Sequence, residues 1–211
     1  MRRTLVLAAL CSLALATAVR AEEIPVDQLS YPVPRDHQVR IKFPVGDLRV
    51  ETTNGDHIEF ELRANCHRHW ERCADRVRNV RVESEDFGGK LRLEIRGYPK
   101  MNTGFSLIGV LRVPRDHGLE VHMGVGDLVV EGLQGNLDLN LGVGDARIRT
   151  DESAVRDVDV ATGIGDADVR THTGHVRHHG FISSSANWDE GRGKASVNLR
   201  VGVGDADVRL D

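Results

Sequence analysis

The clearest feature of the chain is a motif of alternating apolar and polar residues that recurs five times without gaps. Each copy consists of an alternating segment, a Gly-x-Gly-Asp step and a second alternating segment, except that Pro44 replaces the first glycine of the first copy. A period of two is typical of β-strands, whose successive side chains point to opposite faces. The five copies span residues 39–51, 119–131, 137–149, 158–170 and 197–209.

The alternation changes phase at the Gly-Asp step of every copy. In the third copy the apolar face passes from Leu141 and Val143 before the step to Ala146 after it. A strand that turns a corner and keeps its apolar side inward shows this slip. Glycine permits the positive φ and close backbone approach of a tight corner. We therefore predict structural turns at Gly46, Asp47, Gly124, Gly126, Asp127, Gly142, Gly144, Asp145, Gly163, Gly165, Asp166, Gly202, Gly204 and Asp205.

The spacing of the turn aspartates predicts the architecture. Asp127 and Asp145 are 18 residues apart, Asp145 and Asp166 are 21 apart, and Asp166 and Asp205 are 39 apart, close to twice that interval. A repeat of about 20 residues that cannot bury its own apolar face indicates stacked coils. We expect an all-β fold, namely a flattened single-chain parallel β-solenoid, or β-helix, with about 20 residues per coil, plus N-terminal strands and a disulfide loop.

The connections between copies are less regular. The opposite corner of a coil is expected at a Gly-Asn step, which is Gly135–Asn136 between the second and third copies. Between the last two copies we expect a degenerate coil with a corner at 183–186 and a surface loop around Trp188. Residues 39–118 form an irregular part with strands at 58–64, 77–85, 90–97 and 107–114 and a helical turn at 70–76, whereas 119–211 hold the regular coils. Together they make one domain, 39–211, preceded by an extension at 22–38.

The first 21 residues read as a signal peptide. Arg2 and Arg3 precede an apolar run, Leu5 to Ala16, which is too short to span a membrane, and Ala21 offers a small residue for cleavage. Loss of Arg2, Arg3 and Arg20 takes the net charge from −4 to −7. An acidic chain without a basic block argues against nucleic acid as a partner. We expect an exported protein without a transmembrane anchor, located in the periplasm, on the cell surface or outside the cell.

Two cysteines remain in the mature chain. Cys66 and Cys73 lie close together, and in an oxidising compartment such a pair is most simply a disulfide. The alternative is a zinc site completed by His67 or His69, although no second ligand pair lies at a finger-like spacing.

The turn aspartates also raise the question of metal binding. Asp127, Asp145, Asp166 and Asp205 should form a column with a spacing of about 4.8 Å, in which like charges repel. A calcium ion could bridge neighbouring carboxylates, but the preferred interpretation is that each aspartate accepts N–H bonds within its own turn. On the outward face we expect Arg147 to pair with Asp168 of the next coil.

The histidines of THTGHVRHHG, which are His172, His175, His178 and His179, are candidates for a transition-metal site. Exposed histidines near a loop are the simpler interpretation. No nucleophile or zinc-protease motif occurs, and we expect no catalytic residues and no cofactor.

Residues 111–148, in which a Val-Pro strand leads into consecutive Gly-x-Gly-Asp turns, resemble a bacterial family of putative adhesins whose β-helical coils turn on Gly-x-Gly motifs. The resemblance extends with less fidelity over 39–211. It implies a right-handed β-helix without known catalytic residues and an adhesive or structural role in the envelope.

The leading hypothesis is an exported, non-enzymatic adhesion or scaffold module with an envelope or surface partner. The alternatives are a periplasmic metal or ligand binder that uses His172–His179, and a polysaccharide-active β-helix enzyme. Because the last copy ends at Asp211, its open edge could support self-association.

Overall fold

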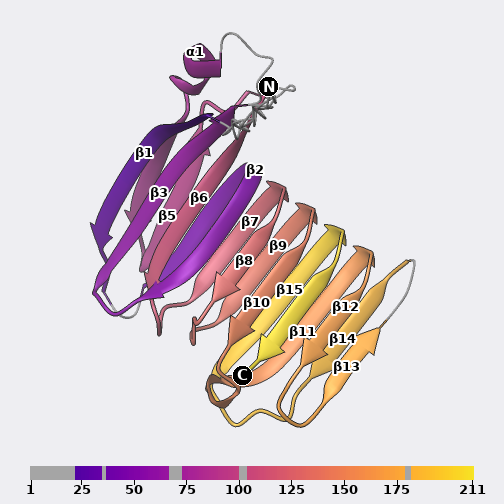
Figure 1. Ribbon diagram of the computed structural model, residues 1–211. Helices are drawn as coiled ribbons and strands as arrows, with labels where there is room; N and C mark the ends of the chain where they lie inside the picture. The colour runs from indigo at the N-terminus through magenta and orange to yellow at the C-terminus, as the bar shows by residue number, and fades with distance from the viewer. Residues whose placement is uncertain (1–21, 35–36, 67–72, 100–103, 179–181) are drawn as a thin grey trace, which may run out of the picture.

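The computed structural model describes residues 22–34, 37–66, 73–99, 104–178 and 182–211, which form an all-β protein (Figure 1). The all-β prediction is confirmed, and the strands join into one mixed sheet of 16 strands. The predicted signal peptide lies outside the described residues. The elements of the first half are β1 (Glu22–Pro32), β2 (Gln38–Thr53), β3 (His57–Cys66), α1 (Cys73–Val77), β4 (Arg81–Phe87), β5 (Lys90–Arg96) and β6 (Phe105–Pro114). Those of the second half are β7 (Leu119–Val125), β8 (Leu128–Glu131), β9 (Leu137–Val143), β10 (Ala146–Thr150), a 3-10 turn (Glu152–Ala154), β11 (Val155–Ile164), β12 (Ala167–Arg170), β13 (His175–His178), β14 (Ser184–Trp188), β15 (Ala195–Val203) and β16 (Ala206–Leu210).

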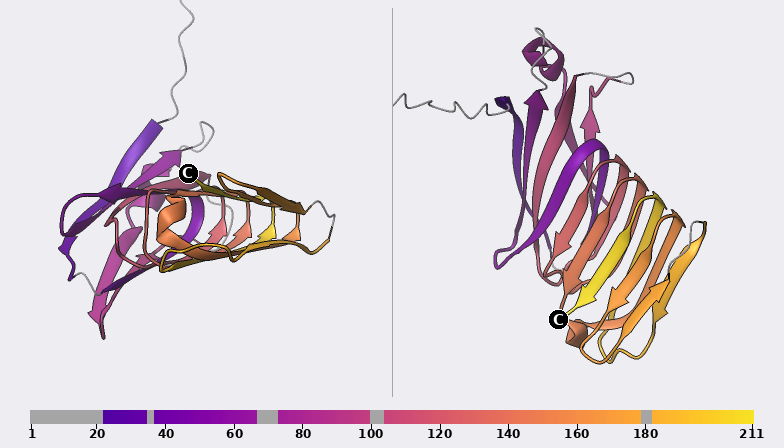
Figure 2. Two further views of the ribbon diagram at one scale, coloured as in Figure 1. Left: turned by 90° about the horizontal axis from the view of Figure 1, so that it is seen from below. Right: turned by 45° about the vertical axis from the view of Figure 1, so that its right-hand side comes forward.

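The five motif copies build two facing ladders of parallel strands. The first ladder contains the strands before each Gly-Asp step, in the spatial order β2, β7, β9, β15 and β11. The second contains the strands after the step, in the order β2, β8, β10, β16 and β12. Strand β2 belongs to both because it continues through the corner. Seen end-on, the ladders are two thin layers with the corner between them (Figure 2).

The space between the ladders holds small aliphatic side chains. Leu139, Leu199 and Val160 lie in register on the first ladder, and Ile148, Val208 and Val169 face them from the second. All six are at most 2% exposed. Close-packed side chains of this size fit the narrow gap between the sheets. As predicted, Ala146 faces inward after the corner of the third copy, and Ile148, two residues further on, does so as well.

The copies do not stack in the order of the sequence. Strands β15 and β16, from the last copy, lie between those of the third and fourth copies. The expectation that the last copy leaves an open edge is therefore wrong, because β16 pairs with β10 on one side and β12 on the other. The basis suggested for self-association through the C-terminal coil is lost with it.

A pair of antiparallel strands covers the narrow end of the molecule. Strand β13 runs antiparallel to β12, and β14 runs antiparallel to β11. This corrects the prediction of a parallel degenerate coil in this region. It also corrects the predicted surface loop around Trp188, because Trp188 lies in β14 opposite Val158 and is only 8% exposed. The sheet is thus mixed rather than wholly parallel.

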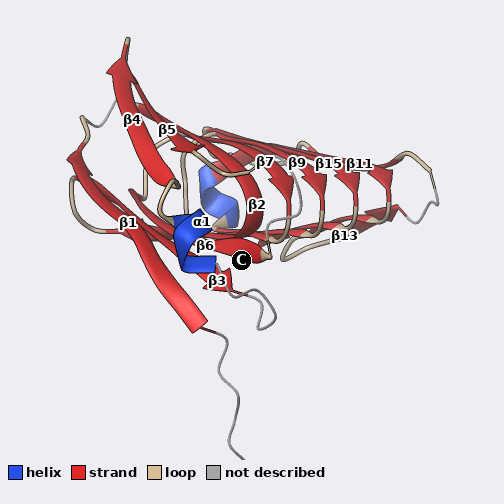
Figure 3. Ribbon diagram, turned by 90° about the horizontal axis from the view of Figure 1, so that it is seen from above, coloured by secondary structure: helices blue, strands red, loops and turns tan. Residues whose placement is uncertain are grey.

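The opposite end of the molecule is wider (Figure 3). It holds the buried phenylalanines Phe43, Phe60 and Phe105. Strands β4, β5, β2, β6, β3 and β1 are paired in that order and curl around these three side chains, each at most 3% exposed. The carboxylate of Asp27 on β1 accepts a hydrogen bond of 2.9 Å from the N–H of Val82, which follows the start of β4, so the outer strands approach each other. This curled sheet closes the wide end of the core.

A disulfide joins Cys66 at the end of β3 to Cys73 at the start of α1, as predicted. The pairing removes both thiols from the alternative zinc site, and His67 and His69 lie outside the described residues. The predicted helical turn at 70–76 corresponds to α1, with 70–72 outside the described residues. Within the described ranges, no helix has the length and apolar character needed to cross a membrane.

Candidate functional site

Both glycines of the motif are required by close contact between neighbouring copies. The second glycine has a φ of 127° to 134° in all five copies, a region that other L-residues rarely adopt. A Cβ on Gly144 would lie 1.9 Å from the carbonyl oxygen of Gly126. A Cβ on the first glycine of the same copy, Gly142, would lie 2.5 Å from the carbonyl oxygen of Gly124. Pro44 occupies the equivalent place in β2, where the pairing with β5 has already ended at Lys42.

The turn aspartates form a column in which three carboxylates accept a hydrogen bond from the backbone of the neighbouring copy. Oδ1 of Asp127 accepts from the N–H of Asp145 at 3.4 Å, and Oδ1 of Asp145 accepts from the N–H of Asp205 at 3.1 Å. Oδ1 of Asp205 accepts from the N–H of Asp166 at 2.9 Å. The predicted backbone acceptor role is thus correct in kind, but the partner lies in the next copy rather than in the same turn.

The residue between the two glycines faces solvent in the later copies. Val125, Val143, Val203 and Ile164 are 46%, 46%, 44% and 43% exposed. With partly exposed Val45 they lie in register at the corner, and we call these five residues the aliphatic row. Val143 was expected on the inner face, but the chain has already begun to turn at this position. The sequence signal for this row is that the variable position of the motif is Val or Ile in all five copies.

Beside the aliphatic row, a groove of about 740 Å³ crosses the outer face of the first ladder. Its floor is the row of first motif positions, Pro44, Gly124, Gly142, Gly202 and Gly163, which carry almost no side chain. Beside this floor the groove is lined by a polar row, formed in spatial order by Lys42, His122, Asn140, Arg200 and Ala161. Five strands at a spacing of about 4.8 Å make this corner groove about 19 Å long.

Two cations of the polar row have no partner. Neither Lys42 nor Arg200 makes a side-chain hydrogen bond or ion pair within the described part of the chain, and both are exposed. Many other arginines are paired, for example Arg49 with Glu131 at 3.1 Å. Glu94 also lines the groove, but its carboxylate is already paired with Arg96 at 2.9 Å. The corner groove therefore presents two uncommitted positive charges.

A buried ion pair lies one row further from the corner. Arg40 donates to the carboxylate of Glu120, its register partner on β7, and His122 contacts the same carboxylate at 2.8 Å. The hydrogen bond from Arg40 is the main reason that the pKa of Glu120 falls from 4.5 to about 2, against the opposing effect of burial. Glu120 is 9% exposed at its side chain and is already neutralised by Arg40. Glu120 therefore helps to hold β7 against β2 next to the polar row.

A second buried acid, Asp168, fastens the strands at the narrow end. Its side chain is 6% exposed and binds Nε2 of His175 at 2.8 Å, Nε of Arg177, and an Nη of Arg170 at 3.2 Å. Burial raises the pKa of Asp168, but hydrogen bonds from His175 and Arg177 outweigh it and lower the pKa overall. The predicted pair between Arg147 and Asp168 is wrong, because Asp207 lies between them and Arg147 contacts Asp145 at 3.4 Å.

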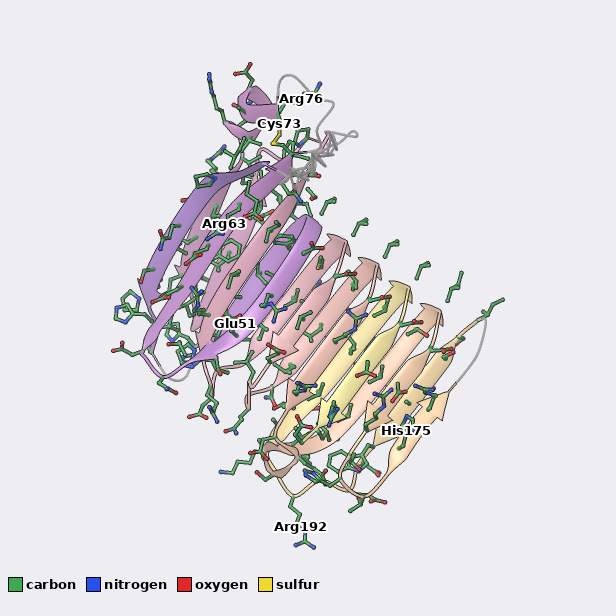
Figure 4. All side chains as sticks on the ribbon, in the orientation of Figure 1. Glu51, Arg63, Cys73, Arg76, His175 and Arg192 are labelled. Atoms are coloured by element: carbon green, nitrogen blue, oxygen red, sulfur yellow. A yellow bond between two sulfur atoms is a disulfide. The ribbon has the colours of Figure 1, made fainter. Side chains whose placement is uncertain are left out.

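The candidate histidines do not converge on one point. His172 binds Glu152 through its backbone N–H at 2.8 Å and its Nδ1 at 3.2 Å, whereas His175 binds Asp168. The backbone of His178 pairs with Ala167, and His179 lies outside the described residues. In the described ranges no group of three or more His, Cys, Asp or Glu residues is placed to hold a metal ion. His175 and Cys73 mark opposite ends of the molecule (Figure 4).

Comparison with known proteins gives a likeness of fold. No family model and no curated protein matches the chain. A solved structure of a putative cell adhesion protein from Clostridium sporogenes ATCC 15579 superposes with a TM-score of 0.54 at 14% identity, covering 89% of this chain and 100% of that one. A putative adhesin from Bacteroides fragilis NCTC 9343 gives a TM-score of 0.29 at 9% identity, covering 89% and 97%. At 14% identity, the likeness to the Clostridium sporogenes protein concerns the fold alone.

Proposed function

We propose that this chain is an exported, non-enzymatic module of the bacterial envelope that acts in adhesion or as a scaffold, and that it binds its partner along the corner groove. The observation that carries the proposal is the continuity of the groove across five copies, with uncommitted Lys42 and Arg200 in its lining and the exposed aliphatic row at the corner that follows its floor. Exposed apolar side chains arranged in one patch mark interaction surfaces. The name of the structural neighbour from Clostridium sporogenes agrees with this role.

We further infer that residues 119–211 serve as a short, flattened β-solenoid within the mixed sheet. The parallel pairing of successive corners and the repeated glycine contacts support this interpretation. A stack of similar coils is a rigid object whose outer rows are fixed by the backbone. Such a scaffold holds the groove in one shape before a partner arrives, which lowers the entropic cost of binding.

The proposal of a non-enzymatic role is supported by the state of the buried acids. Glu120 is held by Arg40, and Asp168 by His175, Arg177 and Arg170. A general acid or base must release or take up a proton near neutral pH, whereas these ion pairs favour the charged carboxylate. The arrangement is therefore better suited to holding strands together than to proton transfer.

The adhesive role can be tested with beads that carry the purified chain. Retention would be measured on wells coated with envelope fractions, neutral and acidic polysaccharides, and extracellular proteins. We expect retention on at least one surface and a loss of severalfold or more for the triple variant V125T/V143T/V203T, which keeps the shape of the aliphatic row and adds hydroxyl groups. No retention on any surface would contradict the proposal.

The control is the double variant V129T/V176T, which places the same change on the second ladder and on β13, away from the groove. Its retention should match that of the unmodified chain. Equal losses in both variants would show that the groove is not the binding surface. Export would be tested separately, by fractionation and by protease access to intact cells, and a protein found only in the cytoplasm would contradict it.

A further inference from the structure

We propose that the corner groove binds a carboxylate-bearing polysaccharide that lies across the strands, with its acidic groups paired to Lys42 and Arg200. This inference rests on the proposed binding role and adds the chemical class of the partner. The two cations stand at the first and fourth of five strands, so about 14 Å separates their rungs. The side chains between them, His122 and Asn140, can exchange hydrogen bonds with hydroxyl groups.

The orientation of the occupant follows from the pairing of the floor strands. Strands β7, β9 and β15 are paired on both sides within the ladder, so they have no free edge to which a peptide could add as another strand. An occupant is therefore held by side chains and not by main-chain hydrogen bonds. Because the floor is mostly glycine, the body of the occupant can approach the backbone closely.

The shape of the groove favours a uniform chain over a folded protein surface or a peptide with anchor residues. Protein partners usually bury aromatic or Arg anchors in well-packed pockets. Here the floor repeats glycine, and the corner next to it repeats nearly the same exposed aliphatic side chain at every rung, from Val125 to Ile164. A polysaccharide offers matching repetition, with C–H surfaces toward the aliphatic row and hydroxyl and carboxylate groups toward the polar row.

The electrostatics near the groove agree with an anionic occupant. The acids closest to the polar row are already engaged: Glu120 by Arg40, Glu94 by Arg96, and Asp138 by the Asn140 amide at 3.1 Å. Lys42 and Arg200 have no such partner in the described structure. Carboxylates pair strongly with Lys and Arg when the cation is not already committed. The neighbour of Arg200 on β11 is Ala161, whereas exposed Asp159 lies opposite Asn198, one outward row further from the corner, and does not line the groove.

The test compares binding of the full chain to polygalacturonate, alginate, neutral dextran, polyglutamate and single-stranded DNA, measured by affinity electrophoresis and calorimetry at low and high salt. We expect saturable binding to at least one of the two acidic polysaccharides, weakened by salt, and at least tenfold weaker binding to the other three polymers. The variant K42Q/R200Q should lose about tenfold in affinity.

The matched control is R192Q/K194Q, which removes two charges at the other end of the strands, where Arg192 projects away from the corners (Figure 4). Its affinity should stay within about twofold of the original. Equal binding of polyglutamate or DNA would overturn the polysaccharide assignment, as would an equal loss in both double variants.

The outcomes for this inference and for the adhesive role are distinguishable. If no acidic polysaccharide binds but retention on another surface still depends on the aliphatic row, the ligand class is wrong and the adhesive role stands. If the polysaccharide binds and is shortened, as shown by new reducing ends or unsaturated products, the ligand class stands and the non-enzymatic proposal is overturned.

Discussion

The carboxylate of Asp205 accepts a hydrogen bond from the backbone N–H of Asp166, which precedes it by 39 residues, at 2.9 Å. The same contact links Asp145 to the N–H of Asp205 at 3.1 Å. One oxygen of each carboxylate thus satisfies an N–H at a corner where the strand ladder is interrupted. The aspartate column is stabilised by these bonds in spite of the repulsion between its charges.

A comparison of Asp205→Asn with Asp205→Ala separates the hydrogen bond from the charge. Asparagine keeps the acceptor oxygen and reduces repulsion from Asp145 and Asp166, so the free energy of unfolding should stay within about 0.5 kcal/mol of the original or rise. Alanine removes the acceptor and should cost about 1 kcal/mol. Urea unfolding with calcium or chelator present provides the measurement. A large loss for Asp205→Asn that depends on calcium would instead favour ion bridging.

A second prediction concerns the corner glycines. In Gly144→Ala the new Cβ would meet the carbonyl oxygen of Gly126 at 1.9 Å, and φ is 132°, so the neighbouring strands must separate. We expect a loss of more than about 3 kcal/mol in unfolding free energy. Gly88→Ala is the control, because φ is also positive, at 61°, but nothing lies within 4 Å of its Cβ. That variant should cost about 1 kcal/mol, and similar losses in both would refute the role of the inter-strand contact.

The third prediction follows from the low pKa of Glu120. Because the hydrogen bond from Arg40 lowers this pKa from 4.5 to about 2, the pair contributes stability above pH 4.5, and the contribution is lost as pH falls toward 2. Glu120→Gln should therefore cost about 2 kcal/mol at pH 7 and progressively less between pH 4.5 and 2. Unfolding measured across this pH range tests the sign.

The control for Glu120 is Glu131→Gln, which removes an exposed pair with Arg49 whose side chains are 43% and 50% exposed. An exposed pair contributes little, so the cost should be under about 1 kcal/mol. A cost for Glu120→Gln that is independent of pH would show that packing, and not the charge, is lost.

The corners could be predicted from sequence because their cause is local. The position of Gly144 requires a positive φ and no side chain, and the repeated glycine in the motif indicates this requirement directly. The inward positions after the corner, such as Ala146, follow from the period of two. Val143 was misplaced because the period was continued one residue too far, into the turn.

The order of the copies could not be predicted in the same way. Val169 and Ile148 have the same place in their copies, so either would suit Val208 as a neighbour. The pattern therefore leaves the order of equivalent strands undecided. What distinguishes the orders is the intervening segment 171–194, whose strands β13 and β14 turn back against β12 and β11. No repeated motif in the sequence marks these two antiparallel strands.

The buried ion pairs were missed for a related reason. Outward positions of a strand are normally solvated, and Glu120 occupies such a position. It is buried because Arg40, 80 residues away in sequence, covers it from the adjacent strand. Asp168 is buried similarly by His175 and Arg177 of β13. Neither contact follows from local spacing, because both depend on which strands become neighbours.

The position of the last copy gives the final prediction, which concerns two valines on either side of β12. Val208 on β16 and Val176 on β13 both lie in register with Val169. If the last copy were the end of the stack, Val208 would be the more dispensable of the two. In the structure Val208 is fully buried on β16, which lies between β10 and β12. Val176 is 40% exposed on the outermost strand.

Val208→Ala should therefore cost about 2 kcal/mol in unfolding free energy, because it leaves a cavity between the ladders. Val176→Ala, the same chemical change at the edge, should cost under about 0.5 kcal/mol. Hydrogen exchange should show the loss of protection spreading to both β10 and β12 in the Val208 variant, since β16 is bonded to each of them. A loss confined to β16 itself would mean that the last copy lies at an end of the stack.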